Sequence, residues 1–154
     1  MSAAAVPAGS TTSARTIASH VLGDLEVTPD QLLTFPEGLH GFPEHTEFAL
    51  LPAAREGFWW LQAADEAGLA FLLTDPFRTA DGYELDLSDG DAQFLSLNSP
   101  DDALVLSIVT LPAAEGGTLT ANLRGPLVCN VVTRTARQIV SRNEQHGFAV
   151  PVSL

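Results

Sequence analysis

The sequence is short of cysteine and has no long apolar run, and both absences limit where the protein works. Cys129 is the only cysteine, so no disulfide forms within the chain, which is typical of a reducing cytoplasm. No apolar run approaches the roughly 20 residues that a membrane-spanning helix needs. The N-terminus carries no basic residue before Arg15 and no continuous apolar block, so we expect no secretory signal. The sequence therefore predicts a cytoplasmic protein that does not enter a membrane.

Lysine is absent as well, and seven arginines oppose 19 carboxylates, which gives a net charge of −12. Residues 17–123 hold 18 of the acids and two arginines, a charge of −16, whereas residues 124–154 hold four arginines and one acid, a charge of +3. A body this acidic repels nucleic acid and attracts basic partners over long distances. We therefore expect no direct nucleic-acid binding, although a merely solubilising surface also accounts for the acidity.

Composition separates a tail from a folded domain. Residues 1–16 include 11 Ala, Ser or Thr residues, which predicts a flexible N-terminal tail. The chain as a whole is 45% apolar, and a chain of 154 residues has enough apolar surface for one core. We expect a single domain over residues 17–154.

Most of the chain is typical of short β-strands separated by turns. Alternating or β-branched apolar residues predict strands over residues 20–27, 32–35, 47–51, 58–62, 69–74, 83–87, 103–111, 118–123 and 126–133. Residues 91–97 fit a short helix or a strand, and residues 133–140 fit a helix but are better explained as the return strand of a hairpin. We predict an all-β, mostly antiparallel, small barrel-like domain with at most a short helix.

The segment "FPEGLHGF", Phe35 to Phe42, predicts a tight return of the chain. Gly38 and Gly41 are able to adopt positive φ, which lets Phe35 and Phe42 fold onto the same apolar surface. We expect a largely buried core that includes the following residues: Phe35, Phe42, Leu61, Phe71, Ile108, Val109 and Val128.

No pattern in the sequence assembles a reaction centre. His40 and His45 flank Glu44, but Gly41 and Pro43 between them forbid the helical spacing of a zinc site. The paired carboxylates lie in turn-like segments where both acids stay ionised; these pairs are Asp65/Glu66, Asp89/Asp91 and Asp101/Asp102. Cys129 lies among aliphatic residues and is better explained as a core thiol than as a nucleophile. We expect no catalytic residue, no metal and no cofactor.

Recognition of another protein is the remaining role, and two places suggest it. Trp59 and Trp60 put one indole on each face of a strand, so we expect one in the core and the other half-exposed. Asn122 and Asn130 flank a Gly-Pro break between two strands, where their side chains either satisfy backbone groups freed by the break or face a partner.

These segments resemble the flagellar assembly factor FliW family over about residues 21–148. The resemblance rests on "LGDLEV", "FPEGLHGF", "FWWLQAADEAGLAFLLTDP", "YEL", "SIVTLP", "TANLRGPLVCN" and Gln138, in the order of the family. Ala121, Gly125 and Cys129 depart from the family pattern, and all three positions concern packing.

The resemblance implies an all-β barrel without enzyme activity or cofactor. It also implies a cytoplasmic partner switch that binds flagellin and the RNA-binding translational repressor CsrA, and thereby relieves repression of flagellin mRNA. On this basis the candidate protein-binding residues are Glu37, Asp65, Trp59, Tyr83, Asn122, Arg124, Pro126 and Gln138. The alternatives are an enzyme, which predicts converging polar groups with perturbed pKa values, and a small-ligand carrier, which predicts an unfilled barrel lumen.

Overall fold

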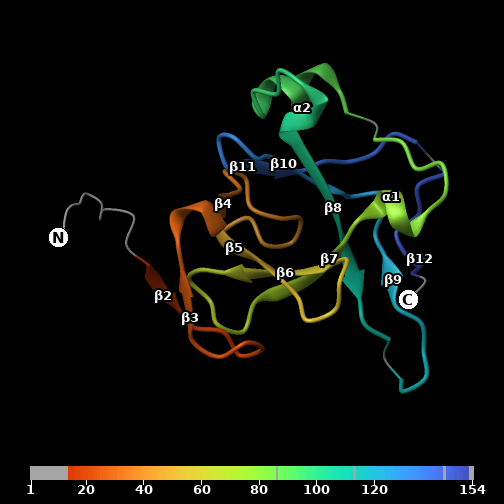
Figure 1. The fold of residues 1–154 in the computed structure, drawn as a ribbon. Helices are drawn as coiled ribbons and strands as arrows, with labels where there is room; N and C mark the ends of the chain where they lie inside the picture. Colours follow the sequence, from red (N-terminus) through yellow and green to blue (C-terminus); the bar gives the residue numbers. More distant parts are fainter. Residues whose placement is uncertain (1–13, 86, 113, 144, 153–154) are drawn as a thin grey trace.

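The computed structural model describes residues 14–85, 87–112, 114–143 and 145–152 (Figure 1). Most of the expected N-terminal tail, residues 1–13, lies outside this range. Arg15 and Thr16, which the sequence assigns to the same tail, belong to strand β2 (Arg15–Ile17), which is paired with β3 (Leu25–Val27). None of the helices in the described ranges has the length and apolarity that a bilayer span requires.

Seven strands of the described chain close into a barrel, which confirms the predicted all-β, barrel-like fold. In their order around the barrel they are β4 (Leu32–Thr34), β5 (Glu47–Pro52), β6 (Phe58–Ala63), β7 (Ala70–Thr74), β8 (Ala103–Thr110), β10 (Leu127–Asn130) and β11 (Thr135–Gln138). Each of these strands is antiparallel to its neighbours, except that β11 meets β4 in parallel at Thr135 and Thr34. The return strand expected at residues 133–140 is therefore confirmed as β11.

Strand β8 is the strand at which the barrel closes. Along one edge it pairs with β10 through residues 103–106 and with β9 (Thr120–Ala121) through residues 109–110. Along the other edge it pairs with β7 through residues 107–109 only. Strand β12 (Val150–Pro151) extends this sheet beyond β9.

The barrel interior is filled by side chains that alternate along its strands. One continuous cluster contains Leu33, Phe35, Leu39, Phe48, Leu61, Ala63, Leu73, Leu106, Leu127, Cys129 and Ala136, each at most 2% exposed. Burial raises the pKa of the Cys129 thiol to about 12, so this cysteine is a core residue as expected. A filled interior contradicts the unfilled lumen that a small-ligand carrier requires.

Three smaller apolar clusters cover the outside of the barrel. The β2–β3 hairpin packs Ile17 and Val27 on Ala49 of β5. The segment around helix α2 (Asp89–Phe94) packs on the outer faces of β8 and β10, with Leu95, Val105, Val128 and Ile139 buried. The segments around β9 and β12 bury Phe58, Tyr83, Val109, Ala121, Leu123 and Val152. The barrel wall is therefore buried on both sides over much of its area.

Short helical turns with side-chain caps connect the strands. Helix α1 (Pro76–Thr79) begins after Asp75, whose carboxylate accepts a 2.9 Å hydrogen bond from the N–H of Phe77. Helix α2 begins after Ser88, whose hydroxyl accepts from the N–H of Asp91. The ambiguous segment 91–97 therefore contains the end of a helix. Two 3₁₀ turns, η1 (Pro29–Gln31) and η2 (Pro100–Asp102), complete the connections in the described ranges.

Four strand predictions were wrong in extent or in kind. Of the expected strands 118–123 and 126–133, only Thr120–Ala121 and Leu127–Asn130 are strands. Only residues 25–27 of the expected strand 20–27 are extended and paired, because the chain turns before them and Gly23 has φ of 77°. The described residues of segment 83–87 form no strand. Tyr83, Leu85 and Leu87 nevertheless pack into two of the outer clusters. Their alternation therefore reflects packing of every second side chain, although the backbone does not pair with another strand.

The predicted core is confirmed at Phe35, Leu61, Val109 and Val128, all of which are buried. Phe42 is 38% exposed, so the prediction that it is buried was wrong. Its ring packs edge-on against the half-buried Phe71, with ring centroids 5.5 Å apart, and Phe71 continues inward to Phe48 and Phe35. Phe42 therefore covers the outer end of a row of aromatic rings.

Three further burial predictions were wrong in degree. Ile108 and Phe71 are half-buried rather than buried. Trp59 and Trp60 are both half-buried, so neither indole is a core residue, and Trp59 packs against the interior cluster from its edge.

The return at residues 35–42 needs glycine at two positions, as expected, but for different reasons. Gly38 has φ of 68° and Gly41 has φ of 89°. A Cβ on Gly38 would lie 2.4 Å from the carbonyl oxygen of Phe42, whereas a Cβ on Gly41 would meet no atom within 4 Å. Only Gly38 combines a left-handed backbone with a close approach of the chain.

This difference predicts unequal losses of stability for Gly38→Ala and Gly41→Ala. We expect Gly41→Ala to lower the free energy of unfolding by about 1–2 kcal/mol, because alanine is disfavoured at positive φ. Gly38→Ala should lose about 1–3 kcal/mol more, because its Cβ also overlaps the backbone. Urea unfolding of the two variants measures both values, and equal losses would contradict the close approach.

Candidate protein-binding site

Gln138 joins the return at residues 35–42 to the corner between β9 and β10. Its side-chain oxygen accepts a 2.8 Å hydrogen bond from the N–H of His40, and its Nε2 donates a 2.9 Å bond to the carbonyl of Gly125. A Cβ on Gly125 would lie 3.0 Å from this Nε2, so glycine lets the two segments meet. Gln138 is buried and therefore sets the distance between two loops.

The corner itself is held by Asn122. Its Oδ1 accepts hydrogen bonds of 3.0 Å from the N–H groups of both Arg124 and Gly125. Pro126 is buried, and its carbonyl accepts from the N–H of Ile139. Of the two readings of the asparagines, the structural one is confirmed for Asn122.

Asn130 has the same role one strand later. Its Oδ1 accepts from the N–H groups of Val132 and Thr133, and its Nδ2 donates to the carbonyl of Leu95 at 2.8 Å. The second bond crosses to the chain that follows helix α2. Asn130 therefore fixes both the β10–β11 turn and the position of that helix, which confirms the structural reading here too.

Arg124 connects the corner to the C-terminal segment. Its Nε donates a 2.8 Å hydrogen bond to the carbonyl of His146, and its guanidinium lies 5.2 Å from the ring centroid of Phe148. The His146 ring is buried, stacks on Tyr83 with centroids 4.7 Å apart, and lies 2.6 Å from the hydroxyl of Ser141. Arg124, His146 and Tyr83 thus form one continuous chain of contacts.

Tyr83 lies deep in this arrangement. It is 8% exposed, and its ring packs edge-on against Phe77 with centroids 5.0 Å apart. Burial raises the pKa of its hydroxyl to about 12, so the phenol stays protonated at physiological pH. The hydroxyl has no hydrogen-bond partner within the described part of the chain.

Glu37 and Asp65 are the most exposed of the predicted binding residues. Glu37 is 57% exposed and accepts a 2.9 Å hydrogen bond from Arg137. Arg137 also contacts Asp91 at 3.3 Å, and its guanidinium lies 4.1 Å from the ring centroid of Phe94. Sequence reasoning missed Arg137 as the residue that joins the return, helix α2 and β11.

Asp65 lies in the β6–β7 connection, and its 61%-exposed side chain contacts the Nδ1 atom of His45 at 2.8 Å. This hydrogen bond raises the pKa of His45, and it lowers the pKa of Asp65. The histidine at position 45 therefore has a carboxylate partner that its sequence neighbours do not reveal.

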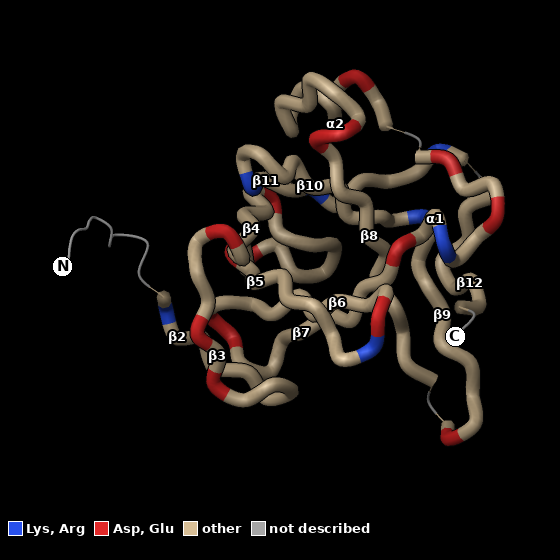
Figure 2. Tube along the Cα trace, viewed as in Figure 1, with Lys and Arg blue, Asp and Glu red and all other residues tan. Residues whose placement is uncertain are grey.

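The structure thus separates the eight predicted residues into two groups. Asn122, Arg124, Pro126, Gln138 and Tyr83 belong to the connected corner, and Glu37 adjoins it through Arg137 next to Gln138. Asp65 lies at the β6–β7 connection and Trp59 at the other end of β6. Acidic positions are spread over loops around the barrel (Figure 2). Within the described ranges, no group of three or more His, Cys, Asp or Glu side chains is placed to hold a metal ion.

The polar residues of the corner bond to loops of the chain itself, and the chain as a whole has a net charge of −12. The class that this fold and charge define is a small acidic β-barrel. A family model described as FliW protein matches residues 16–152, and the chain therefore belongs to the FliW family.

The relatives that the chain resembles support the same assignment. It is 39% identical over 124 residues to the flagellar assembly factor FliW of Treponema denticola, an alignment covering 80% of this chain and 84% of that protein. It is 37% identical over 134 residues to that of Leptospira biflexa, covering 86% and 88%. A crystal structure of the flagellar assembly factor FliW matches with a TM-score of 0.81 and 29% identity, covering 91% of this chain and 98% of that one. The family consists of assembly factors rather than enzymes, so the prediction of a non-enzyme is confirmed by membership.

The bridge made by Gln138 predicts a specific loss of stability. Gln138→Leu leaves the N–H of His40 and the carbonyl of Gly125 without partners, and we expect a loss of about 2–4 kcal/mol because each unpaired group costs about 1–3 kcal/mol. Gln93→Leu, at an exposed position on α2, is the matched control and should change stability by less than about 0.5 kcal/mol. Denaturant unfolding compares the two, and similar values would show that the bridge contributes nothing.

The His45–Asp65 contact predicts a pH window. A raised pKa of His45 means that its contribution is present at low pH and is lost as the pH rises through that pKa. A lowered pKa of Asp65 means that its contribution is lost as the pH falls through that pKa. The His45–Asp65 contact should therefore be present at pH values between the lowered pKa of Asp65 and the raised pKa of His45. NMR titration should show His45 titrating above 6.5, and Asp65→Asn should move it down; an unchanged titration would exclude the contact.

Proposed function

We propose that this chain is a flagellar assembly factor that works in the cytoplasm by binding two proteins, flagellin and the RNA-binding translational regulator CsrA. Bound to CsrA, it relieves repression of flagellin mRNA translation. Abundant flagellin occupies this chain and frees CsrA, and export of flagellin reverses the exchange. The chain itself binds neither nucleic acid nor membrane.

Membership of the FliW family is the observation that carries this proposal. The family model spans residues 16–152, and the relatives named above are flagellar assembly factors. The two partners come from the resemblance of the chain to that family. The single cysteine, buried in the barrel, suits the reducing cytoplasm in which both partners would be met.

The net charge of −12 supports a role as an antagonist of an RNA-binding protein. A protein that grips RNA presents basic surface, so an acidic chain is drawn to it over long distances. Once bound next to the RNA site, the negative field of this chain repels phosphate without covering the whole site. Two of its arginines are already paired with acids, Arg15 with Glu47 at 2.7 Å and Arg137 with Glu37 at 2.9 Å, which leaves less positive charge for RNA.

The candidate residues divide between two roles in this proposal. Glu37 and Asp65 are exposed, so they steer a basic partner and set the salt dependence of association. Asn122, Pro126, Gln138 and Tyr83 hold the shape of the corner, and Arg124 and Trp59 lie half-buried at its edge and at the end of β6. The contact surface would therefore be acidic at its rim and rigid beneath.

The exchange of partners is tested with three purified components. This chain should lower the binding of CsrA to flagellin mRNA, and an excess of flagellin should restore it, because the two partners bind in mutually unfavourable ways. Fluorescence anisotropy of a labelled RNA measures both steps. Raising the salt concentration should weaken the inhibition, since the Debye length falls from about 10 Å at 0.1 M to about 3 Å at 1 M.

The controls separate antagonism from competition for RNA. This chain alone should leave the anisotropy of the RNA unchanged. If it never lowers CsrA–RNA binding, or if flagellin never restores that binding, the partner switch is wrong for this chain.

A further inference from the structure

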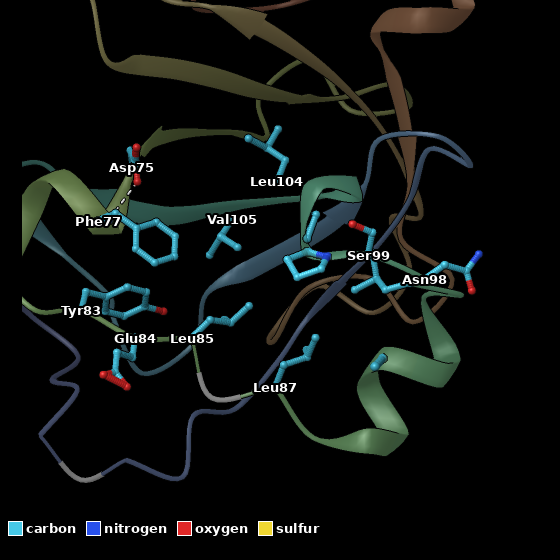
Figure 3. A pocket seen from close by; sticks show the side chains of 14 residues that line it. Asp75, Phe77, Tyr83, Glu84, Leu85, Leu87, Asn98, Ser99, Leu104 and Val105 are labelled. Atoms are coloured by element: carbon cyan, nitrogen blue, oxygen red, sulfur yellow. Dashed lines mark hydrogen bonds between the residues drawn. The ribbon is translucent and has the colours of Figure 1, made fainter.

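A groove of about 740 Å³ lies outside the barrel, between helix α1, residues 83–85 and 87, and the segment from α2 to η2 (Figure 3). Its lining is mostly apolar and includes Phe77, Leu85, Leu87 and Leu97. Phe77 is 51% exposed although it is a large aromatic residue. A groove of this size holds several side chains of a partner.

Leu104 and Val105 of β8 line the groove at a part of the strand where β7 no longer pairs with it. The ladder between β7 and β8 ends at the pair Thr74 and Ser107, after which the chain leaves β7 and enters α1 at Pro76. The carbonyl of Ile108 accepts from Asn122 on the β9 side, so even-numbered residues of β8 direct their backbone groups to β9 and β10. Val105 therefore directs its N–H and C=O to the opposite edge. In the described part of the chain no strand pairs with β8 on that edge at Val105.

Tyr83 supplies a second unpaired group in the same place. Its side chain lines the groove and is more than nine-tenths buried, and its hydroxyl points inward among the other lining side chains (Figure 3). This hydroxyl has no hydrogen-bond partner among the described residues. Buried polar groups are almost always paired, so an unpaired hydroxyl facing a groove indicates a bound molecule that pairs with it.

The charge of the groove favours a basic occupant. Asp75 and Glu84 contribute to its lining, with the Glu84 carboxylate directed away from the other lining side chains (Figure 3), and no arginine or histidine contributes. Lysine does not occur in the chain. A cation from a partner would meet the carboxylate of Asp75 there and no competing charge among the lining residues.

We propose that this groove receives an extended segment of a partner protein that alternates apolar and basic residues and adds a short strand beside Val105. The segment takes the place that β7 would occupy if it continued past Thr74, with apolar side chains against Leu85 and Leu97 and a basic one toward Asp75. An extended segment pairs with the N–H and C=O of Val105, whereas a helix satisfies its own backbone and leaves both groups unpaired. This proposal rests on the proposed function, in which the chain acts by binding proteins.

Hydrogen exchange with a peptide probe tests the added strand directly. The probe is an acetylated, amidated hexapeptide that alternates lysine and valine, and the control alternates glutamate and valine. At a probe concentration ten times its dissociation constant, exchange of the Val105 amide should slow about tenfold, because only the bound state protects it. The acidic peptide should give no protection. Protection elsewhere with none at Val105, equal binding of both peptides, or a helical bound peptide overturns the proposal.

Variants of the full chain test the lining of the groove with the same peptide probe. Phe77→Arg places a cation in the groove and should abolish binding of the lysine–valine probe. Leu111→Arg, at an apolar position that is 58% exposed and outside the groove lining, is the matched control and should leave binding unchanged. Tyr83→Phe removes an unpaired hydroxyl, so it should keep stability and weaken the probe about 2- to 10-fold.

The same variants separate this proposal from the proposed function. If the unmodified chain binds flagellin or CsrA and Phe77→Arg binds both with unchanged affinity, the groove proposal fails and the function stands. If the unmodified chain binds neither protein, the function fails, and protection of Val105 by the probe still decides the groove.

Discussion

Strand β8 carries the constraint on which the remainder of the fold depends. Its two edges are shared among three strands, with β10 and β9 in succession on one side and β7 on the other, so its pairing with β10 joins the two ends of the strand order. Its inward residue Leu106 belongs to the interior cluster, and its outward residues Val105 and Val109 belong to two different outer clusters. Separating β8 from either neighbour would expose apolar surface on both sides of the wall at once. The groove exists for the same reason, since β8 is longer than the strand that pairs with it.

The strands of the barrel could be predicted because their residues are buried on a period of two and bounded by Gly or Pro turns. The same rule failed at Tyr83, Leu85 and Leu87, where every second residue is buried by packing on the outside of the barrel. Periodicity reports which side chains leave water, and it does not report whether the backbone is paired. Phe42 was misassigned for a related reason: a ring that caps a row of aromatic residues contacts the core and still faces solvent.

The candidate site was predictable only where partners are close in sequence. The caps made by Asn122 and Asn130 bond to N–H groups two or three residues ahead, which follows from the chemistry of asparagine at a chain break. Gln138 and Arg137 bond to residues about one hundred positions away, at His40 and Glu37. The stacking of His146 on Tyr83 also joins distant segments. Such contacts form when the barrel closes, so local sequence patterns do not predict them.

An unpaired strand edge also promotes aggregation, because it is able to pair with the edge of a sheet in another molecule. The edge at Val105 is short. On one side the chain that leaves β7 enters helix α1 at Pro76, and on the other side Pro100 begins the η2 turn that leads into β8. Proline cannot donate to a ladder, so a strand added here cannot be extended in register along either flank. The surrounding negative charge repels further copies of the same acidic chain. These features oppose polymerisation through the unpaired edge of β8.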